Sequence, residues 1–315
     1  MTYLAVLLIA AALAAALTPA VRALGRRWGL VDPPGGRKIH TIEVPRLGGV
    51  GVTLAAVLSL ATVTALGWAS VSDVVSWAPA LLGVVIVFGV GLRDDLKPVR
   101  PVVKLAFQVL AALVAIAMGV RIDHVTLVGT THPLGWLGVP VTLLWIVGLT
   151  NAFNLMDGLD GLATGLAIIA AATCATVSIS RGDTQGGLLL GALLGALCGF
   201  LPYNFNPATI FLGDSGSLVV GHVLAVTAIN GWQKGATALA VAVPLLIFAL
   251  PISETLLSIV RRTRGHGVRH IFSADREHLH YQLLGLGLSH RAAVLLLYVV
   301  SLALSLLALA TMQMR

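Results

Sequence analysis

The stretch Asn151–Gly161 reads Asn-Ala-Phe-Asn-Leu-Met-Asp-Gly-Leu-Asp-Gly and lies between two long apolar runs. Its amides and carboxylates recur every third residue, at Asn151, Asn154, Asp157 and Asp160. Capping of the following helix would account for one of the acids but not for the whole row. Because an ionisable group beside lipid is costly without a partner, we predict that this stretch ends a membrane-spanning helix and belongs to a site for a metal ion or a substrate.

The composition predicts an integral membrane protein. The chain has 315 residues, of which 57% are hydrophobic and 10% are charged, and its mean hydropathy is +0.95. A soluble domain of this length cannot bury so large an apolar fraction. We find no soluble domain or linker and predict one all-α, polytopic transmembrane domain over residues 1–315. Cys174 and Cys198 lie inside apolar runs and indicate nothing about the redox compartment.

Ten apolar runs are long enough to cross a bilayer, or nearly so when tilted. They are Tyr3–Val21, Gly48–Trp68, Trp77–Leu92, Val102–Val120, Val139–Leu155, Leu159–Ser180, Gly187–Tyr203, Leu218–Asn230, Ala236–Ile259 and Ala292–Met312. In the seventh run a glycine recurs every four residues from Gly187 to Gly199, which predicts close helix packing. The segment Arg121–Gly138, rich in Gly, Thr, Pro and Val, predicts a hairpin outside the membrane.

The basic residues predict the orientation. With the N-terminus outside, the outer side holds only Arg121, Arg181, Lys234 and Arg315, which leaves 16 of the 20 Lys and Arg residues inside. We therefore predict a multi-pass protein of the cell membrane with both termini outside and the Asn151–Gly161 stretch at the cytoplasmic face. The net charge of +7 is thus first a topology signal, and we predict no nucleic-acid partner.

Further acids lie on the same predicted face. Asp94 and Asp95 follow the third run and precede Lys97, Arg100 and Lys104. Adjacent carboxylates raise each other's pKa unless cations intervene, and here several cations follow. Taken alone, the pair is typical of a solvated loop end, and it is the other loops that favour a site.

Two later loops complete this polar face. In Gly213-Asp214-Ser215-Gly216 a flexible turn presents one carboxylate, and backbone donors at a helix start suit a phosphate. The same four residues resemble the nucleophile loop of trypsin-like serine proteases, but that match is short and the helical membrane context is wrong for it. The last loop carries Arg276, His278 and His280 without a nearby cysteine, which favours binding of phosphates over binding of zinc.

Taken together, these motifs resemble the polyprenyl-phosphate N-acetylhexosamine-1-phosphate transferase family. Its landmarks occur in order as Asp94-Asp95, the Asn151–Gly161 stretch, Phe211–Ser217 and a late His-x-His loop, and Arg37–His40 followed by Pro45–Gly49 is similar to its first cytoplasmic loop. The likeness is greatest to the bacterial undecaprenyl- or decaprenyl-phosphate GlcNAc-1-phosphate transferase branch, which is glycosyltransferase 4-like. Tyr281 departs from that branch, where a third histidine is usual, and the chain lacks the eleventh span that the branch often has.

The resemblance implies transfer of an N-acetylhexosamine 1-phosphate, with GlcNAc favoured, from a UDP-sugar to undecaprenyl or decaprenyl phosphate. UMP is released, and the product begins a cell-envelope polysaccharide such as lipopolysaccharide or teichoic acid. The implied cofactor is Mg²⁺, with Mn²⁺ as a substitute, because it neutralises two anionic phosphates. A homodimer is left open.

The resemblance also assigns roles to residues. The implied metal ligands are Asp214 and Asn154. The implied catalytic residues are Asp94, Asp95, Asp157, Asp160 and Lys104. The implied substrate-binding residues are Arg276, His278, His280, Asn151, His40 and Arg46. Since the second pKa of a phosphate monoester is about 6, the acceptor is already ionised at neutral pH, and Asp94 is expected to align it more than to deprotonate it.

Two other classes compete with this interpretation. A secondary transporter also buries acids in a helical bundle, but usually at the midplane between repeated halves, whereas these motifs lie at span ends and no repeat is evident. A CDP-alcohol phosphotransferase is echoed by Asp157–Gly161, but the Ala-Arg pair of its motif is missing.

Overall fold

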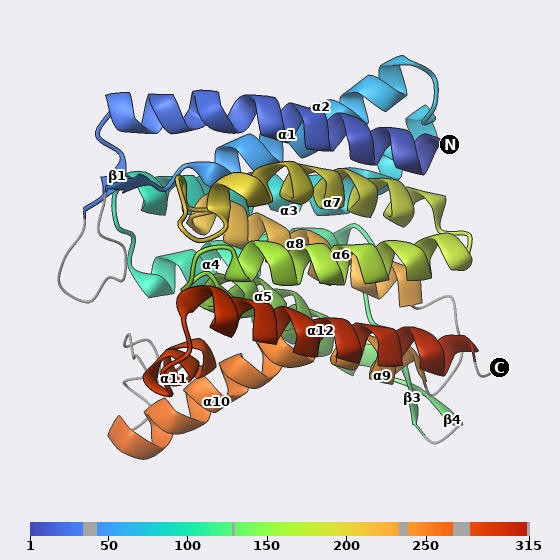
Figure 1. Ribbon diagram of the computed structural model, residues 1–315. Helices are drawn as coiled ribbons and strands as arrows, with labels where there is room; N and C mark the ends of the chain where they lie inside the picture. The colour runs from blue at the N-terminus through green and yellow to red at the C-terminus, as the bar shows by residue number, and fades with distance from the viewer. Residues whose placement is uncertain (34–42, 128–129, 233–238, 267–277, 314–315) are drawn as a thin grey trace.

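The computed structural model describes residues 1–33, 43–127, 130–232, 239–266 and 278–313, which form a bundle of long helices (Figure 1). The long helices are α1 (Thr2–Arg27), α2 (Gly48–Ala65), α3 (Val71–Leu96), α4 (Pro101–Ala117), α5 (Gly138–Met156), α6 (Leu162–Ser180), α7 (Thr184–Asn204), α8 (Asp214–Trp232), α10 (Ala249–His266) and α12 (His290–Gln313). The short elements are β1 (Val31–Asp32), β2 (Val44–Pro45), β3 (His124–Leu127), β4 (Thr130–Pro133), η1 (Gly135–Leu137), α9 (Leu239–Ile247) and α11 (Leu279–Gly285).

The predicted fold class is confirmed. Within the described ranges, seven helices are long and apolar enough to cross a membrane, and α4 and α8 are shorter apolar helices. All ten predicted runs fall on helices, but the ninth is not continuous, because it divides at Phe248 into α9 and α10. Pro251 explains the break, since it has no N–H to donate to the carbonyl of Ile247 and its ring crowds that carbonyl.

Helix α8 is the centre of the bundle. It packs against α2, α3, α5 and α6, and its apolar side chains from Leu218 to Ile229 are buried on every face. Helix α1 packs along α7 and α2, and α7 packs along α6. An apolar helix with no exposed face needs neighbours all round, and this arrangement fixes the start of α8 at one end of the bundle.

The glycines of α7 provide its closest contact, as predicted. A Cβ atom at Gly195 would lie 2.1 Å from the carbonyl oxygen of Leu7, and one at Gly199 would lie 2.2 Å from that of Ala11. Both carbonyls belong to α1, so the small residues allow the two backbones to meet directly.

The two ends of the bundle differ (Figure 1). At one end lie the start of α1, the end of α12 and the hairpin of β3 and β4, in which Val125 pairs with His132. This hairpin confirms the one predicted within Arg121–Gly138. At the opposite end lie β1, α11 and the helix ends that carry the sequence motifs.

Short backbone pairings tie the loops together at the motif-bearing end. Strand β1 pairs with β2. The carbonyl of Pro45 accepts the N–H of Phe211 at 2.8 Å, and the carbonyl of Phe211 accepts the N–H of Gly48 at 2.9 Å. The loop after α1 is thereby joined to the segment that leads into α8.

The α1–α7 contact makes a direct prediction. Gly195→Ala should destabilise the protein by about 1–3 kcal/mol, because the methyl group overlaps a backbone atom that cannot move without separating two helices. Gly89→Ala is the matched control, since Gly89 is exposed on α3 and has nothing within 4 Å of its Cβ position. Thermal unfolding in detergent measures both, and equal melting temperatures for the two variants would contradict the packing argument.

Candidate active site

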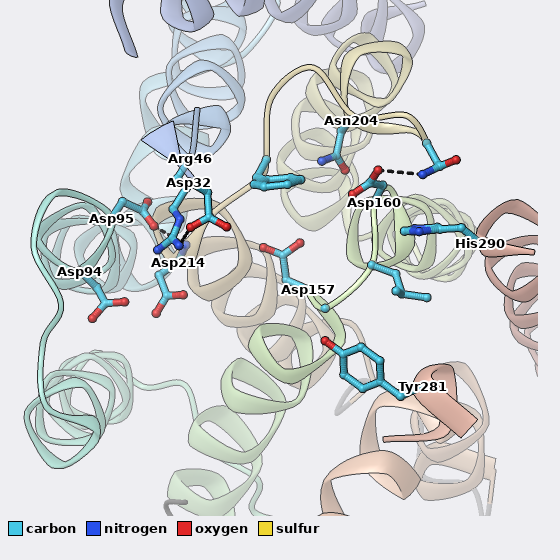
Figure 2. A pocket seen from close by; sticks show the side chains of 15 residues that line it. Asp32, Arg46, Asp94, Asp95, Asp157, Asp160, Asn204, Asp214, Tyr281 and His290 are labelled. Atoms are coloured by element: carbon cyan, nitrogen blue, oxygen red, sulfur yellow. Dashed lines mark hydrogen bonds and ion pairs between the residues drawn. The ribbon is translucent and has the colours of Figure 1, made fainter. Parts of the chain in front are cut away.

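A cavity of about 330 Å³ opens at the motif-bearing end of the bundle (Figure 2). Its described lining includes six aspartates: Asp32, Asp94, Asp95, Asp157, Asp160 and Asp214. Three of them, which we call the acidic wall, come from α3 and α8: Asp94, Asp95 and Asp214. Four uncharged or weakly basic residues, which we call the amide wall, come from the end of α7, the turn after it, α11 and the start of α12: Asn204, Asn206, Tyr281 and His290.

Asp214 is the most connected residue of the acidic wall. It begins α8 directly after Gly213, whose φ of +75° suits glycine. One carboxylate oxygen accepts Lys104 Nζ at 2.6 Å, and the other accepts Asn154 Nδ2 at 3.0 Å. The structure thus brings together three residues predicted for the site from three different helices, and their role toward a metal stays a prediction.

Lys104 joins two of these acids. Its Nζ also lies 3.3 Å from Asp94, whose other carboxylate oxygen accepts the N–H of Val99 at 2.6 Å. The hydropathy pattern predicted Asp94 and Asp95 in a loop after the third span, and this prediction is wrong. Helix α3 continues through Leu96, so both acids lie on its last turn.

Asp95 holds the start of α8 by its backbone. Its two carboxylate oxygens accept the N–H groups of Asp214 at 2.8 Å and Ser215 at 3.0 Å. These are two of the donors that a helix start leaves without intrahelical partners. Asp95 therefore caps α8 from α3 and fixes where Asp214 lies.

The two acids of the central stretch have different surroundings. Asp157 is the C-cap of α5, and Figure 2 shows it between the acidic wall and His290. Burial, reinforced by the charges of Asp214 and Asp95, raises the pKa of Asp157 well above its usual range. Asp160 instead accepts Asn206 Nδ2 at 2.9 Å and the N–H of Ala208 at 3.0 Å, and so positions the turn after α7.

The loop after α1 contributes a cation. Arg46 lines the cavity and forms an ion pair with Asp32, whose side chain is only 8% exposed. His40, predicted for the same loop, lies outside the described residues, as does Arg276 of the last loop.

Five described residues predicted for the site do not line this cavity. Lys104 and Asn154 contact the lining residue Asp214, and the other three lie elsewhere. Asn151 donates to Gln108 of α4 and to the carbonyl of Val147. His278 lies 2.7 Å from Glu254, and the ring of His280 stacks on it at a centroid distance of 5.4 Å. The neighbouring Tyr281 lines the cavity instead and, in Figure 2, points its hydroxyl toward Asp157.

Sequence reasoning missed several lining residues. Asp32, Asn204, Asn206 and His290 belong to none of the residues predicted for the site. His290 lines the cavity, and its buried ring lies close to Asp160. The signal these residues share is a place in loops of the predicted cytoplasmic side, which many residues without function share.

The donor set suits a hard divalent cation. Carboxylate and amide oxygens are the protein ligands that Mg²⁺ prefers, and it usually keeps water or substrate phosphate as further ligands. Among the described residues, no three His, Cys, Asp or Glu side chains are grouped closely enough to hold a metal ion by themselves. An ion here would therefore depend on substrate oxygens for its remaining ligands.

A helical membrane bundle with this cavity defines a class: polytopic membrane proteins with an acidic site at one end of their helices. The chain belongs to glycosyl transferase family 4, whose model matches residues 77–232. That range contains Asp94, Asp157 and Asp214, and the family resemblance of the motifs is thereby confirmed.

Named relatives extend the match over most of the chain. The chain is 35% identical over 286 residues to the probable undecaprenyl-phosphate N-acetylglucosaminyl 1-phosphate transferase of Bacillus subtilis, covering 90% of the chain and 78% of the relative. It is 36% identical over 311 residues to the decaprenyl-phosphate N-acetylglucosaminephosphotransferase of Mycobacterium tuberculosis, covering 89% and 75%. It is 36% identical over 163 residues to the phospho-N-acetylmuramoyl-pentapeptide-transferase of Staphylococcus aureus, covering 51% and 49%.

The buried His280 predicts a pH dependence of stability. Burial, helped by the neighbouring His278, lowers the pKa of His280 to about 4 from an ordinary 6.5. Its ring nitrogens have no hydrogen-bond partner among the described residues. The unfolded chain therefore binds this proton at a higher pH than the folded chain, and the free energy of unfolding falls as the pH drops from about 6.5 toward 4.

At pH 5 this loss should reach about 2 kcal/mol. Thermal unfolding in detergent at pH 7 and pH 5 measures it, with His280→Gln as the comparison. The wild-type melting temperature should fall further than that of the variant, and parallel losses would show that His280 is not the group responsible.

Proposed function

We propose that the chain transfers GlcNAc 1-phosphate from UDP-GlcNAc to a polyprenyl phosphate and releases UMP. The observation that carries the proposal is the Lys104 contact with Asp94 and Asp214 in a cavity at the end of the bundle, on a family-4 chain. Such a cavity can receive a water-soluble donor from one side and a lipid phosphate from the membrane. The relatives' names supply the acceptor and the GlcNAc phosphate group.

The bond changes require little driving force. An oxygen of the lipid phosphate forms a bond to the phosphorus that carries the sugar, and the bond from that phosphorus to the bridging oxygen of UMP breaks. One phosphoanhydride replaces another, so the reaction is expected to be reversible. The main barrier is the approach of two anions, which positioning and positive charge lower.

Mg²⁺, or Mn²⁺ in its place, is the proposed cofactor, held by Asp214 and Asn154. When bound, it neutralises and orients the donor diphosphate. The supporting evidence is the oxygen-rich donor set and the accumulated carboxylates of the acidic wall. The amide of Asn154 now donates to Asp214, so the pair needs only a side-chain flip to present two oxygens together.

The chain's own residues have separate tasks in this proposal. Lys104 already lies between two acids and can exchange one of them for a phosphate oxygen. Asp94 aligns the acceptor, and Arg46 is a second cation at the cavity. The uncharged amide wall then faces the uncharged part of the donor, which is its nucleoside or its sugar.

The proposed orientation places the cavity at the cytoplasmic face. The support is the distribution of Lys and Arg, 16 of 20 of which fall on that side when both termini are outside. UDP-sugars would then reach the site from the cytoplasm.

A direct assay tests the proposal. Purified protein with a short polyprenyl phosphate, magnesium and a panel of UDP-sugars should release UMP with UDP-GlcNAc. Asp214→Ala should abolish release at every magnesium concentration, because both Lys104 and the ion lose their shared carboxylate. Asp123→Asn is the matched control, since that side chain is 62% exposed and pairs with Arg121 at the opposite end.

The outcomes separate the alternatives. No UMP with any sugar would refute the transferase, and turnover with CDP-alcohols would replace it with that rival. Uptake into vesicles without UMP release would support a transporter. Near-normal turnover of Asp214→Ala would remove the metal assignment but not the reaction.

The cap that Asp95 provides makes a second prediction. An amide has one acceptor oxygen, so Asp95→Asn leaves an N–H at the start of α8 without its partner, at a cost of about 1–2 kcal/mol. Because Asp214 then shifts, kcat should fall by about 10- to 100-fold. Asp73 offers a matched comparison, since it caps the other end of α3 by accepting the N–H of Ser70 at 2.7 Å. Asp73→Ala, which removes this cap, should lower the melting temperature and leave kcat unchanged, and equal kcat values for the two variants would argue against the positioning role.

A further inference from the structure

Glu254 is a buried acid outside every motif of the family resemblance. It lies on α10, is 2% exposed and does not line the cavity. A carboxylate at such a position needs partners to offset the cost of its burial. The residues that satisfy it therefore indicate what it does.

Its contacts converge on the start of α11. The N–H of Leu279 donates to both carboxylate oxygens, at 3.0 and 3.1 Å, and His278 Nδ1 lies 2.7 Å from one of them. Arg261 of the same helix is more distant, at 4.0 Å. Within the described structure, the close contacts of the Glu254 carboxylate are therefore with the start of α11.

Helix α11 depends on this carboxylate. It has only seven residues, and its N-cap residue His278 makes no side-chain capping hydrogen bond. A helix of this length is unstable by itself, and a negative charge at its N-terminus is favourable. Glu254 supplies both the missing cap and the charge from a neighbouring helix.

Two side chains of α11 connect it to the cavity. A Cβ atom at Gly158 would lie 2.5 Å from His280 Nε2, so the ring of His280 lies directly on the residue after Asp157. Tyr281, whose ring centroid is 4.4 Å from that of His280, lines the cavity. A continuous series of contacts therefore runs from Glu254 through α11 to the central acids.

We propose that Glu254 is a positioning residue that seats α11 and thereby holds Tyr281 in the amide wall, where the uncharged part of the nucleotide-sugar binds. This inference rests on the proposed function for the identity of the donor. A purely structural ion pair would predict something different, namely a loss of stability with unchanged affinity for the donor. Buried ion pairs are by themselves weak evidence for stability.

The first experiment compares Glu254→Gln with Thr255→Val, a change at the next residue of α10 that removes only a hydrogen bond to the carbonyl of Pro251. Glu254→Gln should raise the KM for UDP-GlcNAc by about 10-fold while kcat changes less than about 3-fold. Glu254→Asp, which keeps the charge, should recover part of the loss. Thr255→Val should leave both constants unchanged.

A double-mutant cycle with Tyr281→Ala identifies the route. If Glu254 acts through α11, Glu254→Gln should raise KM little further in the Tyr281→Ala background. Full additivity of the two effects on KM, or a lower melting temperature with wild-type KM, would overturn the inference.

Hydrogen exchange keeps the test independent of turnover. In the full-length protein in detergent, the amides of residues 279–285 should exchange faster in Glu254→Gln than in Thr255→Val. Unchanged exchange there refutes the seating role whether or not the enzyme turns over. Absence of UMP release by the wild type, with faster exchange in Glu254→Gln, would refute the proposed reaction and leave the seating of α11 supported.

Discussion

The contact of Lys104 Nζ with Asp214, at 2.6 Å, is the interaction on which the site depends. Six aspartates line one small cavity, and their mutual repulsion would drive the helix ends apart without compensation. Lys104 offsets two of these charges and connects α3, α4 and α8. The other acids are compensated separately, Asp95 by backbone N–H groups and Asp160 by an amide side chain. Asp157 keeps a raised pKa because it is buried and lies near the charges of Asp214 and Asp95.

The geometry of this contact depends in turn on close backbone packing around the start of α8. A Cβ at Gly49 would lie 2.1 Å from the N atom of Gly216, and one at Gly91 would lie 2.6 Å from the carbonyl oxygen of Asp214. Helices α2 and α3 can approach the start of α8 this closely only because these residues lack side chains. The acidic wall is therefore set by backbone positions, which are more rigid than side-chain rotamers. Asp95 of α3 then fixes the position of the first residues of α8 through its two hydrogen bonds.

Much of this arrangement could be predicted from the sequence, for identifiable reasons. Apolar run length predicts helices in a membrane because backbone hydrogen bonds must be satisfied within the segment, and family resemblance grouped Asp94, Lys104, Asn154 and Asp214. Hydropathy ends a span at its first charges, whereas α3 continues through them to Leu96, so Asp94 was expected in a loop. The break at Phe248 was missed because no polar residue marks it, since residues 245–252 are all apolar. Asp32, Asn206 and His290 reach the cavity through contacts between distant segments, which no local pattern reveals.

The two walls of the cavity have different origins, and this difference bears on substrate choice. The acidic wall comes from helix ends fixed by close packing in the centre of the bundle, and it holds Lys104, the cation proposed to meet the phosphates. The amide wall comes from the turn after α7 and from α11, a seven-residue helix seated by Glu254. Tyr281, the residue at which the chain departs from its branch, lies in this second wall. A hydroxyl there presents a neutral hydrogen-bonding group where a histidine would present a titratable one. The choice among nucleotide-sugars is therefore expected to depend on the position of α11. The transfer of the phosphate is expected to depend on the residues of α3, α4 and α8.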